Sequence, residues 1–427
     1  MQQTWVMRMV KEAGSPLATS PHSSRSWGTV VTIAVVATVL RGLGCEPAGN
    51  PGDDGSEATA GFDASVQLEA VATQLVLPAY NDFLESARAL ESATGTWESA
   101  PETDRAEAKD AARDAWREAM LDWQRAELFQ IGPAGSSITV VGGEDLRDEI
   151  YSWPTVNPCR LDQELVESVW DESGFFSNEL VNVYGLDAIE YLLFREDSEN
   201  TCPPQIPINS DGSWDALGDD GLESKRAAYA SAASTHVVAV AEQLIAAWDP
   251  TQGDFSGQLA GAGEDGSVYL DTSQGMNAIF NALFYVELIV KDRKLARPLG
   301  LRDCSTETCP EALETPWADY SLESLRANLV AGRDLLIYGE GDQRFGLNVL
   351  AEHLGEDELA AEMLSTLDAT IAAVDAISDT GLTTLESEPQ TLHSLYETLK
   401  SFTDLLKGEF AMALFLEVPQ EAAGDSD

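Results

Sequence analysis

The chain has 427 residues, of which 44% are hydrophobic and 23% are charged, a composition typical of a folded globular protein with room for two ordinary domains. Acidic residues outnumber basic residues by 73 to 25, so the net charge is −48. Such a field repels phosphate groups, and we therefore exclude nucleic acid as a partner. The same charge either concentrates cations near the surface or serves solubility in a salty medium.

The N-terminal region has the features of an export signal. An uncharged apolar run at residues 27–40 follows several basic residues, and it is too short for a comfortable bilayer span but fits a secretory signal. A Gly-Leu-Gly-Cys sequence ending at Cys45 then resembles a bacterial lipoprotein cleavage site. We expect residues 1–45 to be a signal peptide and Cys45 to carry the lipid that anchors the chain to a membrane. Residues 46–61, rich in Gly, Pro and Asp, should be a disordered tether.

Apolar residues at helical spacing dominate the remainder of the chain. They predict a first helical bundle over residues 62–215 and, across a segment rich in Pro, Asn, Asp and Gly, a second bundle over residues 216–418. Residues 419–427 are expected to be a disordered tail. The predicted helices are Val66–Leu90, Thr103–Phe129, Asp162–Trp170, Asn178–Phe194, Leu222–Trp248, Thr272–Lys294, Tyr320–Tyr338, Gly346–Leu354, Asp357–Ile377 and Leu392–Leu416. Ser137–Val141 is the only candidate strand, so the predicted class is all-α.

The cysteine pattern fits an exported protein. If Cys45 takes a lipid, four cysteines remain, and an oxidising compartment would pair them. Cys304 and Cys309 lie in one short loop and are expected to form one disulfide, which leaves Cys159 to pair with Cys202. The alternative is a cytosolic protein with four free thiols.

The stretch VNVYGLDAIEYLLF at residues 181–194 combines an apolar stripe with two carboxylates. Asp187 and Glu190 lie three residues apart, so a helix places them on the same face, where they repel each other unless a cation or a hydrogen-bond donor lies between them. A partial copy, GMNAIFNALF at residues 275–284, carries Asn277 in place of the aspartate. We interpret the two stretches as a duplicated helical unit and expect the two bundles to be related by an internal duplication.

Several stretches together resemble the imelysin family. They are Leu77-Pro78-Ala79-Tyr80, Ala115-Trp116-Arg117, Trp123-Gln124, Gly132-Pro133, Ser152-Trp153-Pro154, the run from Gly185 to Phe194, and Lys291-Asp292-Arg293-Lys294-Leu295 with Pro298-Leu299-Gly300-Leu301. The resemblance covers roughly residues 64–418. It implies two α-helical bundles related by duplication, in exported or lipid-anchored proteins of the bacterial envelope that face the periplasm or the cell surface.

The resemblance also bears on function. Some members of the imelysin family are linked to iron uptake or regulated by iron, and the first-named member was described as a peptidase. The family signature is Gly-x-His-x-x-Glu. Here Gly185 and Glu190 match the signature, while Asp187 stands at the position of the histidine.

The sequence offers little for hydrolytic chemistry. A zinc hydrolase needs about three protein ligands, usually with histidine among them, and an open position for water. Beyond the signal peptide the histidines are His236, His353 and His393, and none has His-Glu-x-x-His spacing. No Gly-x-Ser-x-Gly elbow and no glycine-rich phosphate loop is present. We therefore predict no catalytic residues.

Binding of a cation by oxygen ligands is the remaining chemistry that the sequence supports. Asp187 and Glu190, joined by Glu127, would form a carboxylate cluster in the first bundle, and carboxylates suit hard ions such as a divalent or ferric cation. The alternative is structural: Asp187 caps its helix or faces solvent, and Glu190 pairs with an arginine such as Arg125.

Trp123, Trp153 and Asn277 are the further candidates for ligand contact, and each tryptophan either forms a ligand platform or belongs to the core. The sequence thus predicts a lipid-anchored, non-catalytic envelope protein that binds a ligand or metal and serves iron acquisition, with iron-uptake components as candidate partners. One alternative is a metal-dependent peptidase that uses the Gly-x-Asp-x-x-Glu motif. Another is an envelope module whose cleft between the bundles binds a polysaccharide or another protein.

Overall fold

The computed structural model describes residues 62–423; the predicted signal peptide, Cys45, the tether and the last residues of the predicted tail lie outside this range. Within it, the regular elements are all helical, apart from one isolated bridge between Tyr338 and Phe345. The predicted all-α class is therefore confirmed. None of the helices in this part of the chain is long and apolar enough to cross a bilayer.

The candidate strand Ser137–Val141 is wrong, because these residues form turns. The carboxylate of Asp145 accepts a hydrogen bond from the backbone N–H of Ser137 at 2.8 Å, which folds the segment back on itself. The side chain of Ile138 is 91% exposed, so the alternating apolar pattern in this stretch reflects no buried face.

Helices of the first half pack around a long central helix. In chain order they are α1 (Ala64–Ala70), α2 (Leu77–Ser99), α3 (Arg105–Glu127), α4 (Leu146–Ile150), α5 (Pro158–Glu167), α6 (Phe175–Asn178), α7 (Leu186–Phe194), α8 (Pro207–Ser210), α9 (Gly218–Trp248) and α10 (Phe255–Ala260). The central helix α2 packs along both α3 and α9, and α7 packs against α3 and α9. Large aromatic side chains, including Trp97, Trp116 and Trp248, are fully buried between these helices.

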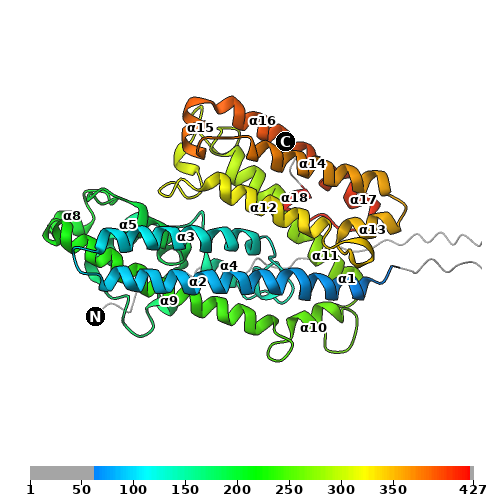
Figure 1. Cartoon of the computed structure of the whole chain (residues 1–427), viewed down its shortest axis with the longest axis horizontal. Helices are drawn as coiled ribbons and strands as arrows, with labels where there is room; N and C mark the ends of the chain where they lie inside the picture. The colour runs from blue at the N-terminus through cyan, green and yellow to red at the C-terminus, as the bar shows by residue number, and fades with distance from the viewer. Residues whose placement is uncertain (1–61, 424–427) are drawn as a thin grey trace, which may run out of the picture. The chain divides into compact units, whose positions relative to one another are not determined.

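Helices of the second half form a further layer. They are α11 (Thr272–Leu283), the π-helix η5 (Val286–Ala296), α12 (Ser321–Leu336), α13 (Leu347–His353), α14 (Asp357–Asp375), α15 (Gly381–Ser387), α16 (Pro389–Leu405), the π-helix η8 (Leu406–Phe410), α17 (Ala411–Ala413) and α18 (Gln420–Ala423). Here α14 packs against both α12 and α16. Figure 1 shows this layer lying over the layer of α2, α3 and α9, and the two meet where α3 packs against α12.

The helix predicted as Val66–Leu90 contains a π-helical turn before Pro78. This turn, Val71–Val76, lies between α1 and α2, and the backbone stays helical through it. Proline has no N–H to donate to the preceding turn, and the departure from α-helical hydrogen bonding lies at that turn.

The predicted boundary between residues 215 and 216 separates α9 from the helices against which it packs. The loop-rich segment before α9 does connect two helical regions, but α9 returns along α2 and completes the first layer. The composition predicts a linker there. It does not predict that α9 packs against α2, because that contact joins segments distant in the sequence.

The internal duplication remains a prediction, and the local geometry of α7 recurs at α13 rather than at residues 275–284. Gly185 before α7 has φ 94° and ψ −176°, and Gly346 before α13 has φ 120° and ψ −178°. Both glycines touch a carbonyl at the end of an earlier helix: an added Cβ would lie 2.8 Å from the oxygen of Ile150 and 2.6 Å from that of Leu336. Only glycine adopts this backbone easily. Gly275, by contrast, lies inside α11.

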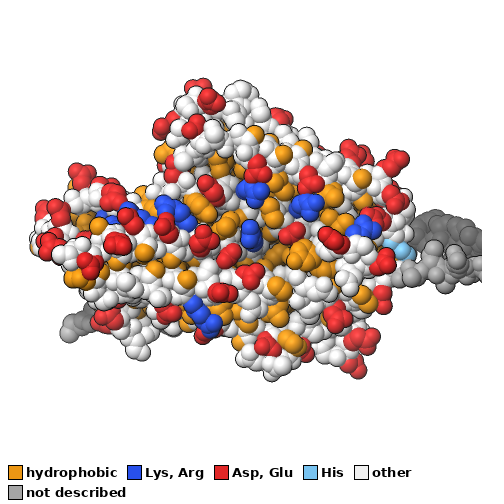
Figure 2. Space-filling model, viewed as in Figure 1, with side chains coloured by type: hydrophobic (Ala, Val, Ile, Leu, Met, Phe, Trp, Pro, Cys, Tyr) orange, Lys and Arg blue, Asp and Glu red, His pale blue; other side chains and the backbone are white. Residues whose placement is uncertain are grey.

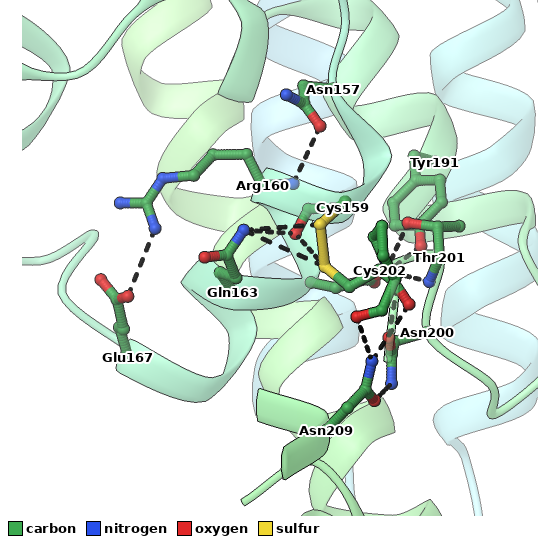
Figure 3. The surroundings of a disulfide bond; sticks show 12 residues. Asn157, Cys159, Arg160, Gln163, Glu167, Tyr191, Asn200, Thr201, Cys202 and Asn209 are labelled. Atoms are coloured by element: carbon green, nitrogen blue, oxygen red, sulfur yellow. Dashed lines mark hydrogen bonds and ion pairs between the residues drawn. A yellow bond between two sulfur atoms is a disulfide. The ribbon is translucent and has the colours of Figure 1, made fainter. Parts of the chain in front are cut away.

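Both predicted disulfides are present. Cys159 at the start of α5 pairs with Cys202 in the loop after α7, as Figure 3 shows. The same loop is held to α5 by Asp162, which accepts hydrogen bonds from the backbone N–H (2.6 Å) and the hydroxyl (2.7 Å) of Thr201. Cys304 and Cys309 close a short loop after η5.

Candidate functional site

Contacts from both long neighbours fix the start of α7, the helix that carries the two carboxylates of the sequence motif. The indole N–H of Trp116 on α3 donates to the carbonyl of Leu186 at 2.8 Å. The hydroxyl of Tyr229 on α9 donates to the carbonyl of Val183 at 2.5 Å. The helix therefore begins at a position that the core determines.

Asp187 and Glu190 lie on one face of α7 and line a cavity of about 530 Å³. Each residue is only 1% exposed, so the two carboxylates form the buried end of the cavity. The rest of the wall comes from the segment after α4 and from the loop that follows η5. These lining residues are Trp153, Pro154, Val156, Pro158, Arg297, Asp303, Cys304, Ser305, Cys309, Glu311, Ala312, Leu313, Pro316 and Trp317.

Asp187 is oriented by two hydrogen-bond donors. The hydroxyl of Ser152 donates to Oδ2 at 2.7 Å, and the backbone N–H of Ala188 donates to Oδ1 at 3.0 Å. Burial raises the pKa of Asp187 to about 7, because these hydrogen bonds offset only part of the lost hydration. The alternative in which this residue faces solvent is therefore wrong.

Glu190 is oriented by the backbone of the opposite wall. Its Oε1 accepts from the backbone N–H groups of Trp317 and Ala318, both at 2.9 Å. Its Oε2 has no hydrogen-bond partner among the described residues. Burial raises the pKa of Glu190 to about 8. The alternative ion pair with Arg125 is wrong, since that arginine lies 3.9 Å from Asp122 instead.

A second group of buried polar residues lies behind the cavity, and we call it the Lys294 network. It consists of Gln124, Glu127, Arg147, Lys294, Glu314 and Asn328. The ammonium of Lys294 lies 2.9 Å from Oε1 of Glu314 and donates to Gln124 (2.6 Å) and Asn328 (2.8 Å). Because Lys294 is almost fully buried, these partners compensate for its lost hydration.

Glu127 belongs to this network and does not line the cavity. Its Oε1 accepts from Nε of Arg147 at 2.8 Å, and its Oε2 lies 3.8 Å from the ammonium of Lys294. The arginine continues to the cavity wall, since it also donates to the carbonyl of Trp153 at 3.1 Å. The structure thus brings Asp187 and Glu190 together at the cavity and places Glu127 in the Lys294 network instead.

The remaining predicted contact residues have different positions. Trp153 lines the cavity. Trp123 is fully buried, and its ring lies 4.8 Å from that of Phe83, so it belongs to the core. Asn277 accepts a hydrogen bond from the backbone N–H of Glu417 at 2.8 Å and thereby ties α11 to the C-terminal segment.

Sequence reasoning missed the wall opposite α7. Arg297, Asp303, Glu311 and Trp317 all come from the end of η5 and the loop that contains the Cys304–Cys309 disulfide. The sequence features that stand out in that region are Cys304, Cys309 and the basic run at residues 291–295, which resembles the imelysin family. None of these features shows that the loop lies across from Asp187.

The cavity can receive a cation, but the protein supplies few ligands for it. Among residues 62–423, no group of three or more His, Cys, Asp or Glu side chains is arranged to hold a metal ion. Hard cations take six or more oxygen ligands. Asp187 and Glu190 could supply two or three of these oxygens, and the ligand or water would have to supply the others.

Comparison with known families identifies the family to which the chain belongs. The family model described as imelysin matches residues 76–406, which is most of the chain and includes α7 and the opposite wall of the cavity. The chain belongs to the imelysin family. No curated protein sequence matches this imelysin-family chain.

Solved structures share the fold. An imelysin-like protein from Psychrobacter arcticum 273-4 superposes with a TM-score of 0.60 at 20% identity, over 84% of this chain and 98% of that one. A candidate iron-regulated protein A precursor from Parabacteroides distasonis ATCC 8503 superposes with a TM-score of 0.62 at 17% identity, over 84% of this chain and 97% of that one. At these identities the likeness concerns the fold alone.

Proposed function

We propose that this imelysin-family protein is a lipid-anchored envelope protein that binds a cation-containing ligand and does not catalyse a reaction. The observation that carries the proposal is the buried carboxylate pair. Asp187 and Glu190 are oriented by a hydroxyl and by backbone N–H groups, and no lysine or arginine forms an ion pair with either of them in the described structure. Arg297 lines the same cavity but forms no ion pair with either carboxylate, and two buried carboxylates without an ion-pair partner favour a cation in the ligand.

A role in iron acquisition is part of the proposal. One structural neighbour is described as a candidate iron-regulated protein A precursor, and carboxylates are suitable ligands for ferric iron. The predicted signal peptide and the predicted lipid on Cys45 agree with a precursor that is exported.

A matched pair of strains tests the anchor: wild type should fractionate with membranes, and Cys45→Ala should be recovered in soluble form. Recovery of both forms from membranes in equal yield would contradict the lipid anchor.

Metal analysis tests the site itself. Protein purified without a histidine tag should contain, or take up, one cation per chain, and Asp187→Asn should lower that content at least severalfold. Glu264→Gln is a suitable control, because Glu264 is exposed in a loop away from the cavity. Equal metal contents in all three proteins would contradict the proposal.

A metal-dependent peptidase is the second candidate. The raised pKa of Glu190 favours it, since a carboxyl that titrates near neutral pH is suited to general acid–base chemistry. The Asp at the position of the family histidine leaves fewer of the nitrogen ligands that zinc hydrolases usually have. Hydrolysis of unstructured peptides in the presence of Zn²⁺ or Mn²⁺ that disappears in Glu190→Gln would favour the peptidase over the binding protein.

A further inference from the structure

A second hollow adjoins the carboxylate cavity. It has a volume of about 860 Å³ and shares Pro154, Arg297 and Asp303 with the first cavity, so a ligand could extend from one into the other. The other residues that line it are Leu288, Ile289, Asp292, Arg293, Arg302 and Glu421. Three arginines line this hollow together with three acidic residues, Asp292, Asp303 and Glu421, whereas two carboxylates form the buried end of its neighbour.

Arginines are scarce in this chain, and two of these three lack an acidic partner in the described structure. Acidic residues outnumber basic ones almost threefold in the sequence, and red side chains are spread over the face drawn in Figure 2. Arg302 pairs with Asp292. Arg293 and Arg297, four residues apart on and just after η5, are exposed and form no ion pair with a described residue. Guanidinium groups left open in so acidic a protein suit an anionic group of a ligand.

The first cavity offers a cation too few oxygen ligands. Asp187 and Glu190 are two carboxylates, and one oxygen of Glu190 already accepts two backbone hydrogen bonds. A hard cation there needs several more oxygen ligands than the protein offers. A chelating anion would supply them, and its outer carboxylates would extend toward Arg297 and Arg293.

We propose that the ligand is an anionic chelate, a hard cation held by a small polycarboxylate, with the cation on Asp187 and Glu190 and the free carboxylates of the chelator on Arg297 and Arg293. This inference rests on the proposed function and names its ligand class. A bare cation would use only the first cavity, and a simple carboxylate would use only the second hollow. The chelate uses both, so it should bind more tightly than either component.

Calorimetric titration of the full chain with Mn²⁺ alone, citrate alone and Mn²⁺–citrate tests the inference. Wild type should bind the manganese complex about tenfold or more tightly than either Mn²⁺ or citrate, as expected for one or two added charge-assisted hydrogen bonds. Arg297→Gln should weaken binding of the complex by about tenfold and leave Mn²⁺ binding within about twofold. Arg297→Lys should recover part of the loss, because it keeps the charge but not the planar fork. Asp187→Asn should weaken binding of both Mn²⁺ and the complex.

Arg88→Gln serves as the matched control, because Arg88 is an exposed arginine on α2 whose partner, Glu242, is also exposed. It should bind all three ligands as wild type does. If Arg297→Gln binds the complex as tightly as wild type, or if wild type binds Mn²⁺ but not the complex, the chelate inference is wrong while the cation site stands. If wild type binds neither Mn²⁺ nor the complex, the proposed function itself fails. Citrate binding that equals binding of the complex and is insensitive to Asp187→Asn would show an anion site without a cation, and would also overturn the inference.

Discussion

Two sets of buried charges lie close together in this protein and are compensated differently. In the Lys294 network each carboxylate faces a cation: Glu127 accepts from Arg147, and Glu314 lies 2.9 Å from Lys294. At the cavity, Asp187 and Glu190 are held by a hydroxyl and backbone N–H groups, and the described residues provide no ion pair for them.

Ion-paired carboxylates and unpaired carboxylates should respond differently to substitution. A carboxylate paired with a buried lysine stabilises the fold only while both partners are present. A carboxylate that burial protonates near neutral pH has no such dependence, and it becomes fully charged when a cation arrives. Substitutions in the two sets should therefore have different effects.

The largest effect is expected for Lys294→Met. The substitution leaves Glu314 and Glu127 with fewer positive partners in the core and should lower the free energy of unfolding by about 3–5 kcal/mol. Lys400→Met removes the same charge from an exposed pair with Asp404 and should cost less than about 1 kcal/mol. Denaturant unfolding of both variants measures the contrast, and similar losses in the two would show that the Lys294 network is not a structural element.

The two disulfides should have different roles, one in the stability of the fold and the other in the cavity wall. Cys159–Cys202 spans a sequence separation of 43 and Cys304–Cys309 a separation of 5, so chain-entropy arguments give about 4 and about 2 kcal/mol of stabilisation. Replacing the first pair by serine should lower the melting temperature more. Replacing the second pair should weaken ligand binding more, because Cys304 and Cys309 line the cavity. The reverse ranking in calorimetric melts and titrations would contradict this assignment.

The cavity carboxyls should contribute to the pH dependence of stability, together with Glu164 and Asp334, whose pKa values burial raises to about 7 and about 6. Burial raises the pKa of Asp187 to about 7 and that of Glu190 to about 8, from ordinary values of 3.8 and 4.5. The folded state therefore binds more protons than the unfolded state, and the stability present below about pH 4 is lost as the pH rises through 7 to 8. Between pH 5 and pH 8, metal-free wild type should lose several kcal/mol more than the double variant Asp187→Asn, Glu190→Gln. Parallel pH profiles from denaturant titrations would contradict the raised pKa values.

The smallest effect on stability is expected for Asp187→Asn alone. The amide oxygen can accept from the backbone N–H of Ala188 while the amide NH2 donates to the hydroxyl oxygen of Ser152. The substitution also removes a charge that burial disfavours, so the metal-free variant should be as stable as wild type or more stable by up to about 1 kcal/mol. Cation binding should weaken. A variant that is clearly destabilised and binds cations normally would assign Asp187 to the fold.

The helices were predictable because long apolar stripes have a period that few other structures share. The sequence located α9, α14 and the helices around them to within a few residues. It did not show that residues 178–194 are broken before α7, because the break depends on the positive φ of Gly185 against the carbonyl of Ile150. The π-helices likewise have no sequence signature that periodicity alone could detect.

The candidate site was predictable only in its local part. Asp187 and Glu190 lie three residues apart in one helix, and that spacing alone places them together. Glu127 seemed a third member because it ends a neighbouring helix, but Arg147 and Lys294 hold it behind the cavity. Arg297 and Trp317 lie more than a hundred residues from α7, and contacts across such a distance leave no local pattern.

Anomalous diffraction from crystals grown with Mn²⁺ tests the central claim most directly. The account predicts one strong peak in the cavity about 2.0–2.6 Å from a carboxylate oxygen of Asp187 and from Oε2 of Glu190, and no such peak in Asp187→Asn. A peak elsewhere on this acidic protein, with the cavity empty in wild type at saturating Mn²⁺, would contradict it.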